Sequence, residues 1–405
     1  MLPPQPDQPK TTPSRPPLWT REYLLACLIS LFCATNVYLL MVVTAAYAVD
    51  VFSANSAVAG FAASVFLMGG LLSRGFTGKM LGFLGYKTAL TIGMAANTLL
   101  SFAYILTPNI EFLIIVRLLH GVSFGIITTA APTIAADVVP ASRMGEGMGY
   151  FSLGSTVATG IGPFFAMLLS SGGNYPVIFA ICTTLMLIGL ALCPLMRIKK
   201  LTLSAQDAEK LRGFKLSSII EVPVVPISVV ALLLYFCYGG IVSFLALFMR
   251  TLDLVEFASL FFVVFAVVVF ASRPLVSKLF DARGLKLILI PALACFAVGM
   301  FYFSQTQSHW MLLSSSVLIG LGVGATQAVT LAQVAKITPP ARQGVASTTY
   351  FLFCDIGYFF GPLLIGVCLP SLGFRGVFAI LALVTVLNLA YCVFFTGRHS
   401  KKRGA

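Results

Sequence analysis

The stretch RGFTGKMLGFLGYKTAL, residues 74–90, returns in altered form as RPLVSKLFDARGLKLIL, residues 273–289. Placed together, the two stretches superpose Arg74 on Arg273 and align a glycine that stands eleven residues further on. Each is a short basic segment between two long apolar runs. Because Lys and Arg gather in the cytoplasmic loops of membrane proteins, this pattern predicts two copies of a turn between neighbouring membrane helices.

The offset of 199 residues that relates these stretches holds over most of the chain. Gly162-Pro163 meets Gly361-Pro362 with no gap in between. Chance hardly supplies one gap-free offset over five helices of each half, so we expect two six-helix halves in the same order and orientation. Further matched pairs are Lys79 with Lys278, Gly85 with Gly284, Lys87 with Lys286, Gly121 with Gly320, Gly125 with Gly324, Pro140 with Pro339, Arg143 with Arg342, and Phe179 with Phe378.

Twelve apolar runs reach the length of about 20 residues that a helix needs to cross a bilayer. The predicted fold is therefore an all-α membrane protein, with twelve transmembrane helices in two pseudo-symmetric six-helix bundles. The runs cover residues 23–48, 56–75, 88–107, 110–136, 146–170, 175–196, 223–249, 256–274, 286–305, 310–335, 345–369 and 375–396.

The predicted bundles comprise residues 22–197 and 222–397. Residues 198–221 between them are basic and polar, which indicates a cytoplasmic linker long enough to let two bundles move. Residues 1–21 are rich in proline and polar side chains and lack the apolar core of a signal peptide, so we expect a disordered cytoplasmic tail. Residues 398–405 form a basic cytoplasmic tail.

Composition indicates that the solvent of this chain is a lipid bilayer. Hydrophobic residues make up 59% of the 405 residues and charged residues only 10%, with a mean hydropathy of +0.98. A soluble domain carries about 25% charged residues, and fewer cannot cover a surface that faces water.

The basic residues indicate how the chain crosses the membrane. Of 26 Lys and Arg, 23 lie in or within about a turn of the segments that are cytoplasmic when both termini are inside. The exceptions are Arg117, Arg250 and Arg375. We therefore expect a multi-pass protein of a cell membrane with both termini in the cytoplasm. Its outer loops are too short for a receptor domain and fit a bacterial inner membrane.

Several classes of partner and cofactor are not expected. The net charge of +13 lies in short clusters between apolar runs, and no phosphate loop or base-reading basic helix is present, which excludes nucleic acid. The nine cysteines all lie in apolar runs without metal-ligand spacing, so we expect no disulfide, metal site or cofactor. The expected partners are a small-molecule substrate, protons and lipid, with the chain acting as a monomer.

The segment Gly78-Lys-Met-Leu-Gly82-Phe-Leu-Gly85-Tyr-Lys87 resembles the loop between helices 2 and 3 of the major facilitator superfamily. Within that superfamily the chain is most similar to the branch of proton-coupled drug antiporters with twelve spans. The resemblance covers roughly residues 20–397. Its glycines permit a tight turn and its basic residues stay with the cytoplasmic leaflet. The family's Asp, which helps to lock the outward-facing state, is replaced here by Gly82.

The second half keeps an acid at the matching position, Asp281, close to Gly284. Together with Arg143 at the start of the fifth helix, these residues are predicted to belong to the gate. Its latch is either weaker than in the family or supplied in another way.

Two further motifs carry the resemblance. Arg117-Leu-Leu-His120-Gly121 matches the family motif R-x-x-x-G of helix 4, and an Arg inside a span needs a partner or a wet cavity. Arg117 either has a role in transport or lies close enough to the outer surface for its side chain to snorkel to water. Gly162-Pro163 matches part of the antiporter motif of helix 5, which favours export over uptake.

The candidate site is built around Asp355, the one carboxylate deep within a span. An intramembrane acid is a candidate for carrying the coupling proton or pairing with a cationic substrate, although a satisfied structural Asp is the alternative. Helices 1, 4, 7 and 10 line the cavity in the superfamily. That resemblance favours the polar residues Asn36, Arg117, Tyr235, Tyr238 and Gln327, each of which is equally explained as interhelical packing. Tyr38 and His120 are further polar candidates within spans, and a hydrogen-bonded packing role explains His120 equally well.

The function that these observations favour is secondary active transport by alternating access, with proton-coupled export of a small amphiphilic molecule or drug. The alternative with the same fold is a proton symporter that imports a small metabolite or anion, with Arg117 as the anion's partner. An enzyme is not expected, because the sequence shows no nucleophile with a nearby base, no cluster of His, Asp and Glu and no cofactor motif.

Overall fold

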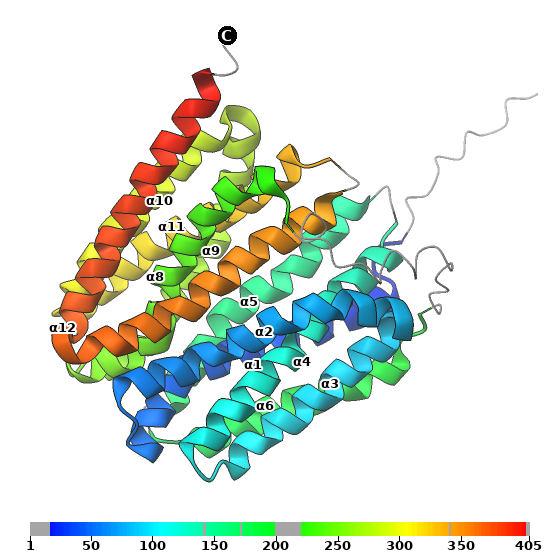
Figure 1. Ribbon diagram of the computed structural model, residues 1–405, viewed down its shortest axis with the longest axis horizontal. Helices are drawn as coiled ribbons and strands as arrows, with labels where there is room; N and C mark the ends of the chain where they lie inside the picture. The colour runs from blue at the N-terminus through cyan, green and yellow to red at the C-terminus, as the bar shows by residue number, and fades with distance from the viewer. Residues whose placement is uncertain (1–16, 141–142, 171, 199–219, 340–341, 402–405) are drawn as a thin grey trace, which may run out of the picture.

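The computed structural model describes residues 17–140, 143–170, 172–198, 220–339 and 342–401. Within these ranges the chain is built of helices and contains no strand, which confirms the predicted fold class. Figure 1 shows the helices as long rods that run side by side, with α1–α6 gathered on one side and α8–α12 on the other. We call these groups the N-half and the C-half.

The helices closely follow the predicted apolar runs. Eleven of the described helices are long and apolar enough to cross a membrane. The last of them covers fifty residues, Val345–Phe394, and is broken at Gly373, so it accounts for two of the twelve predicted spans. The helices are α1 (Arg21–Phe52), α2 (Ser56–Leu84), α3 (Tyr86–Ala103), α4 (Ile110–Val138), α5 (Met144–Ser170), α6 (Tyr175–Leu192), α8 (Val225–Arg250), α9 (Val255–Arg283), α10 (Leu285–Ser304), α11 (His309–Ile337) and α12 (Gln343–Lys401), with short 3-10 turns at Tyr104–Leu106, Cys193–Leu195 and Val222–Val224.

Several helices begin at a polar residue that caps the first turn. The side chain of Asn55 accepts a hydrogen bond from the backbone N–H of Val58 at 2.9 Å, and Asn109 does the same for Phe112 at 2.9 Å. Ser308 caps α11 in the same way. These side chains satisfy N–H groups that have no partner within the helix, so they place the ends of the rods at defined residues.

The predicted loop between helices 2 and 3 is mostly helical, which corrects the expectation that its glycines make the turn. α2 continues to Leu84, so Gly78 and Gly82 lie within the helix. The reversal occurs at Gly85, where φ is 81°, and its repeat partner Gly284 has a φ of 77°. Glycine occupies these positions because other residues are strained at positive φ.

The two halves meet along a seam between α2 and α12 and another between α5 and α9. The Oγ of Ser56 donates a hydrogen bond of 2.8 Å to the carbonyl oxygen of Gly366. A Cβ added at Gly60 would collide with the carbonyl oxygen of Pro362. Small residues therefore let the backbones of the two halves touch. These close contacts of α2 with α12 lie toward the outer end, which we define as the end where α1 and α8 finish; the opposite end is the inner end.

We predict that Gly60→Val destabilises the protein, whereas Gly149→Val does not. A side chain at Gly60 must push α2 away from α12, and overpacking of this kind costs about 1–3 kcal/mol. Nothing lies within 4 Å of a Cβ added at Gly149, which makes it a matched control. Thermal unfolding of the purified protein in detergent should show a lower midpoint for Gly60→Val alone. Equal midpoints for the two variants would mean that the seam is not closely packed.

Candidate functional site

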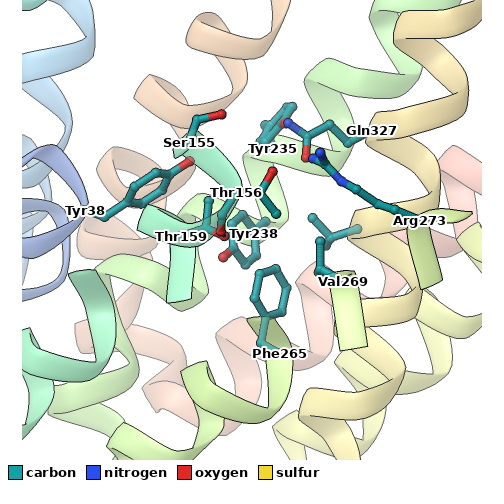
Figure 2. Close-up of a pocket in the computed structure, with 11 residues that line it drawn as sticks. Tyr38, Ser155, Thr156, Thr159, Tyr235, Tyr238, Phe265, Val269, Arg273 and Gln327 are labelled. Carbon is teal, nitrogen blue, oxygen red and sulfur yellow. The ribbon is translucent and has the colours of Figure 1, made fainter. Parts of the chain in front are cut away.

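A cavity of about 50 Å³ lies between the halves. Five helices contribute to it, three of them from the C-half, and Figure 2 shows their side chains converging on one space. Ser155, one of the lining residues, is exposed. The lining residues are Tyr38 of α1, Ser155, Thr156 and Thr159 of α5, Tyr235 and Tyr238 of α8, Phe265, Val269 and Arg273 of α9, and Val323 and Gln327 of α11.

One wall of the cavity is aromatic. The rings of Tyr238 and Phe265 are stacked, with centroids 5.1 Å apart. Behind them, Tyr358 of α12 packs against Tyr235 at 4.8 Å and against Tyr238 at 6.0 Å. Such rings offer a flat apolar surface together with hydroxyl groups, which suits a ligand that is partly apolar and partly polar.

Arg273 provides the charge of the cavity. Its Nε is buried and has no hydrogen-bond partner, and none of the described carboxylates pairs with it. Figure 2 shows its side chain reaching from α9 into the cavity beside Gln327. An arginine stays protonated in proteins, so the cavity contains a fixed positive charge.

Asp355 is paired with an arginine of the other half. The Nε of Arg74 on α2 donates a hydrogen bond of 2.9 Å to Oδ2 of Asp355 on α12. The two side chains are 20% and 16% exposed, so the pair is mostly removed from water. Asp355 stands one helical turn before Tyr358, whose ring packs against the cavity tyrosines. The pair therefore joins the halves next to the cavity.

Arg117 is fully buried inside the N-half, not near the outer surface. Its Nε and Nη2 donate hydrogen bonds to the carbonyl oxygens of Ala62 and Ala63 on α2, at 3.2 and 2.8 Å. Its guanidinium lies over the ring of Phe66 at 4.8 Å. Gly121, four residues further along α4, packs directly against the backbone of Phe66. The R-x-x-x-G motif thus holds α4 against α2.

Asn36 and His120 belong to hydrogen-bond networks within the N-half. Asn36 donates to Oγ of Ser101 at 3.1 Å and to the carbonyl oxygen of Cys182 at 3.2 Å. His120 lies 3.0 Å from Asn97 through Nε2 and 3.0 Å from the hydroxyl of Tyr104 through Nδ1. These contacts join α1, α3, α4 and α6, and neither residue lines the cavity.

The predicted gate residues are spread along the inner end. Nζ of Lys87 donates to the carbonyl oxygen of Met196 at 2.7 Å, which connects the start of α3 to the chain after α6. Arg143 forms an ion pair with Glu146 in the next turn, at 2.8 Å. Asp281 lies in α9, two residues before its end, and its side chain is outside the described part of the structure.

The motif of the fifth helix lies within α5. Gly162 packs against Tyr38, and Pro163 lies within the same helix.

An ion-pair cluster joins the two halves at the outer end, which we call the outer latch. Asp50 at the end of α1 accepts a hydrogen bond from Nη1 of Arg250 on α8 at 2.6 Å. The hydroxyl of Tyr175 on α6 donates to the other carboxylate oxygen of Asp50. Three helix ends from both halves are thereby held together, so the structure is closed at its outer end.

The structure brings together some of the sequence candidates and separates others. Tyr38, Tyr235, Tyr238 and Gln327 meet in the cavity, while Asn36, Arg117 and His120 pack inside the N-half. Sequence analysis did not select Arg273 for the site, although the repeat had already matched it to Arg74. The small hydroxyl residues of α5 were also missed, because no pattern distinguishes them from packing residues.

The chain matches the family described as Major Facilitator Superfamily over residues 26–355 and, in a second match, 255–405. It is 29% identical over 309 residues to "Multidrug resistance protein MdtG" of Enterobacter lignolyticus, which covers 74% of this chain and 72% of that protein. It is 25% identical over 290 residues to an uncharacterized MFS-type transporter of Methanocaldococcus jannaschii, covering 68% of this chain and 72% of that protein.

Solved structures show the same fold. A bacterial homolog of the human lysosomal transporter Spinster has a TM-score of 0.75 at 15% identity, covering 93% of this chain and 96% of its own. A POT family transporter in complex with 5-aminolevulinic acid has a TM-score of 0.77 at 13% identity, with coverage of 93% and 96%. At these identities the likeness concerns the architecture alone.

We predict that Asp50→Asn loosens the outer latch and that Asp253→Asn does not. Both changes remove one negative charge at the outer end, but only Asp50 forms an ion pair with Arg250. Asp253 has a φ of 54°, which asparagine tolerates. Because the latch pair is about one-third exposed, its loss should cost no more than about 1 kcal/mol.

Hydrogen exchange followed by mass spectrometry checks this prediction. Backbone amides near the ends of α1 and α8 should exchange up to about fivefold faster in Asp50→Asn than in the wild type. The inner ends of both helices serve as an internal reference. Unchanged exchange at the outer ends would show that the latch does not hold the halves together.

Proposed function

The chain belongs to the major facilitator superfamily of membrane transporters, and from this premise we propose that it exports a small amphiphilic molecule in exchange for protons. Export is supported by the similarity to proteins named for multidrug resistance, which extends over about three-quarters of the chain. The aromatic and hydroxyl-lined cavity supports an amphiphilic substrate. We also propose that the protein acts as a monomer in a bacterial inner membrane with both termini cytoplasmic.

The ion pair between Arg74 and Asp355 is the observation that carries the proposal of proton coupling. It joins α2 of one half to α12 of the other, and it is mostly buried. A carboxylate that accepts a proton loses its negative charge, so the attraction to Arg74 falls. Protonation of Asp355 thus changes how strongly the two halves are held together, which is what a coupling proton must do.

Tyr358 connects the segment that carries Asp355 to the cavity, and through it the proton to the substrate. Asp355 and Tyr358 lie on the same face of α12, and Tyr358 packs against both cavity tyrosines of α8. A substrate that displaces Tyr235 or Tyr238 presses on Tyr358 and therefore on the segment that carries Asp355. In this way the occupancy of the cavity and the protonation of Asp355 influence the same helix.

Two kinds of contact between the halves support a mechanism of alternating access. The outer latch and the close approach at Gly60 hold the outer end shut in this state. Opening to the outside requires these contacts to break and the halves to rock about the cavity. The ion pair of the outer latch is partly exposed, so it contributes little to stability. It can therefore break when the outer end opens, as contacts form at the inner end.

The import alternative placed an anion on Arg117. In the structure that guanidinium donates to two backbone carbonyls of α2 and lies outside the cavity. This arrangement does not favour a substrate role for Arg117. The direction of transport relative to the proton gradient separates the two functions.

We predict that Asp355→Asn abolishes coupling while substrate still binds. The test uses proteoliposomes loaded with a pH dye and challenged with a panel of lipophilic cations, antibiotics, aromatic carboxylates and small metabolites. In the wild type a transported compound should drive protons in the opposite direction. In Asp355→Asn the substrate should drive no proton movement, because no group at this position titrates.

Three further variants make the result specific. Asp355→Asn leaves Arg74 without its counter-charge, so the double change Arg74→Gln with Asp355→Asn removes both charges and should also be uncoupled. Asp355→Glu should keep coupling. Glu111→Gln removes an exposed carboxylate in the first turn of α4 and should behave like the wild type. Protons that follow the substrate would indicate a symporter, and coupling that survives Asp355→Asn would make Asp355 structural.

A further inference from the structure

The internal repeat relates Arg273 to Arg74, and the same offset relates Thr156 to Asp355. Both correspondences stand close to other matched residues. Lys79 aligns with Lys278 five positions after the arginines, and Gly162 aligns with Gly361 six positions after Thr156 and Asp355. The α2–α12 seam therefore has an arginine and an acid, whereas the α5–α9 seam has an arginine and a threonine. The α5–α9 seam therefore has the positive charge without the counter-charge that the α2–α12 seam provides.

The geometry shows the consequence of this difference. Arg74 is paired with Asp355 at 2.9 Å, while Nε of Arg273 is buried without a partner. The hydroxyl of Thr156 donates to the backbone carbonyl oxygen of Ser152 at 3.1 Å. It carries no charge, so it cannot supply the counter-charge that Asp355 supplies to Arg74. Both Thr156 and Arg273 line the cavity, so the unpaired charge faces the space where a ligand would lie.

We propose that Arg273 is the binding site for an anionic group, and that the transported molecules are small aromatic or amphiphilic carboxylates. This proposal rests on the proposed function and names the substrate class of its cavity. A carboxylate that enters the cavity supplies the counter-charge that Asp355 supplies to Arg74. The guanidinium presents a planar set of donors that matches a carboxylate in two hydrogen bonds.

The surroundings of Arg273 fit a ligand with a polar end and an apolar end. Gln327 lies beside the guanidinium in Figure 2, and its amide can donate a further hydrogen bond to the anion. Tyr238 and Phe265 form a stacked pair that offers a flat surface to a ring. The cavity of about 50 Å³ has room for an anionic group but not for a whole aromatic carboxylate. Binding of such a substrate therefore requires the two halves to separate slightly.

Binding is measured with three probes that share one ring system: 1-naphthoate, the neutral 1-naphthamide and the cationic 1-naphthylmethylammonium. The full-length protein is held in nanodiscs at one pH without a gradient, so that proton coupling does not enter the result. The wild type should bind naphthoate about tenfold more tightly than naphthamide, which corresponds to one charge-assisted contact. It should bind the cation most weakly.

Arg273→Gln should lose the preference for naphthoate and bind naphthamide as the wild type does. Arg273→Lys keeps the charge and should retain part of the preference. Arg375→Gln removes a positive charge beyond the kink in α12, where the side chain contacts the carbonyl oxygen of Thr306, and should leave all three affinities unchanged.

Three results would overturn the proposal. The first is a wild type that does not prefer naphthoate. The second is a preference for naphthoate that persists in Arg273→Gln. If Arg74→Gln removes that preference instead, the anion binds to Arg74 and the proposal is also wrong. The third is a fall in the thermal midpoint, or failure to fold, of Arg273→Gln, since a stabilising contact would then exist where we infer an unpaired charge.

These outcomes are independent of the proposed exchange with protons. If Arg273→Gln loses the preference for naphthoate and Asp355→Asn still couples transport to protons, the anion site is supported and the role of Asp355 in proton coupling is rejected. The reverse combination would retain proton coupling and reject the carboxylate substrates.

Discussion

A charge inside a membrane must be neutralised or hydrated, and this constraint governs how the two halves of the protein meet. A lone charged side chain at the centre of a bilayer costs about 2.5–3.5 kcal/mol on insertion scales. Arg74 and Asp355 avoid that cost only while α2 and α12 lie together. Removing one partner of a buried pair costs about 3–5 kcal/mol, because the other charge is left without compensation. The pair is thus a contact between the halves that one proton can weaken.

The internal repeat gives this constraint its functional meaning. Two equivalent arginines stand at equivalent positions of two seams, yet only one has an acid opposite. The paired arginine connects the halves, and we infer that the unpaired arginine receives the substrate. The difference between Asp355 in one copy and Thr156 in the other thus separates a structural contact from the proposed binding site. The aromatic residues between them connect the two positions through Tyr358.

Much of the fold follows from the sequence, since apolar length and the distribution of Lys and Arg report directly on the bilayer. The predicted spans agree with the helices to within a few residues at most boundaries, and Gly85 is indeed the turn. The expectation failed for Gly78 and Gly82, because a helix that leaves the membrane continues into water when nothing stops it. Tyr235, Tyr238 and Gln327 could be placed near the cavity from the family resemblance, which also selected Asn36 and Arg117, although neither lines it. The partner of Asp355 could not, because it lies 281 residues away and hydropathy says nothing about pairing. Arg117 donates from Nε and Nη2 to backbone carbonyls of α2, and no side-chain pattern reveals such partners.

The most direct test of this account is the distance between the halves as a function of pH. Spin labels at Met144 and Gln343, the first residues of α5 and α12 and related by the same offset, report on the inner end. The distance distribution of the otherwise wild-type protein should shift on acidification as Asp355 loses its charge. With Asp355→Asn added, the labelled protein should show the acidic distribution at neutral pH and should not respond further. An identical response to pH with and without Asp355→Asn would contradict the claim that this ion pair controls the halves.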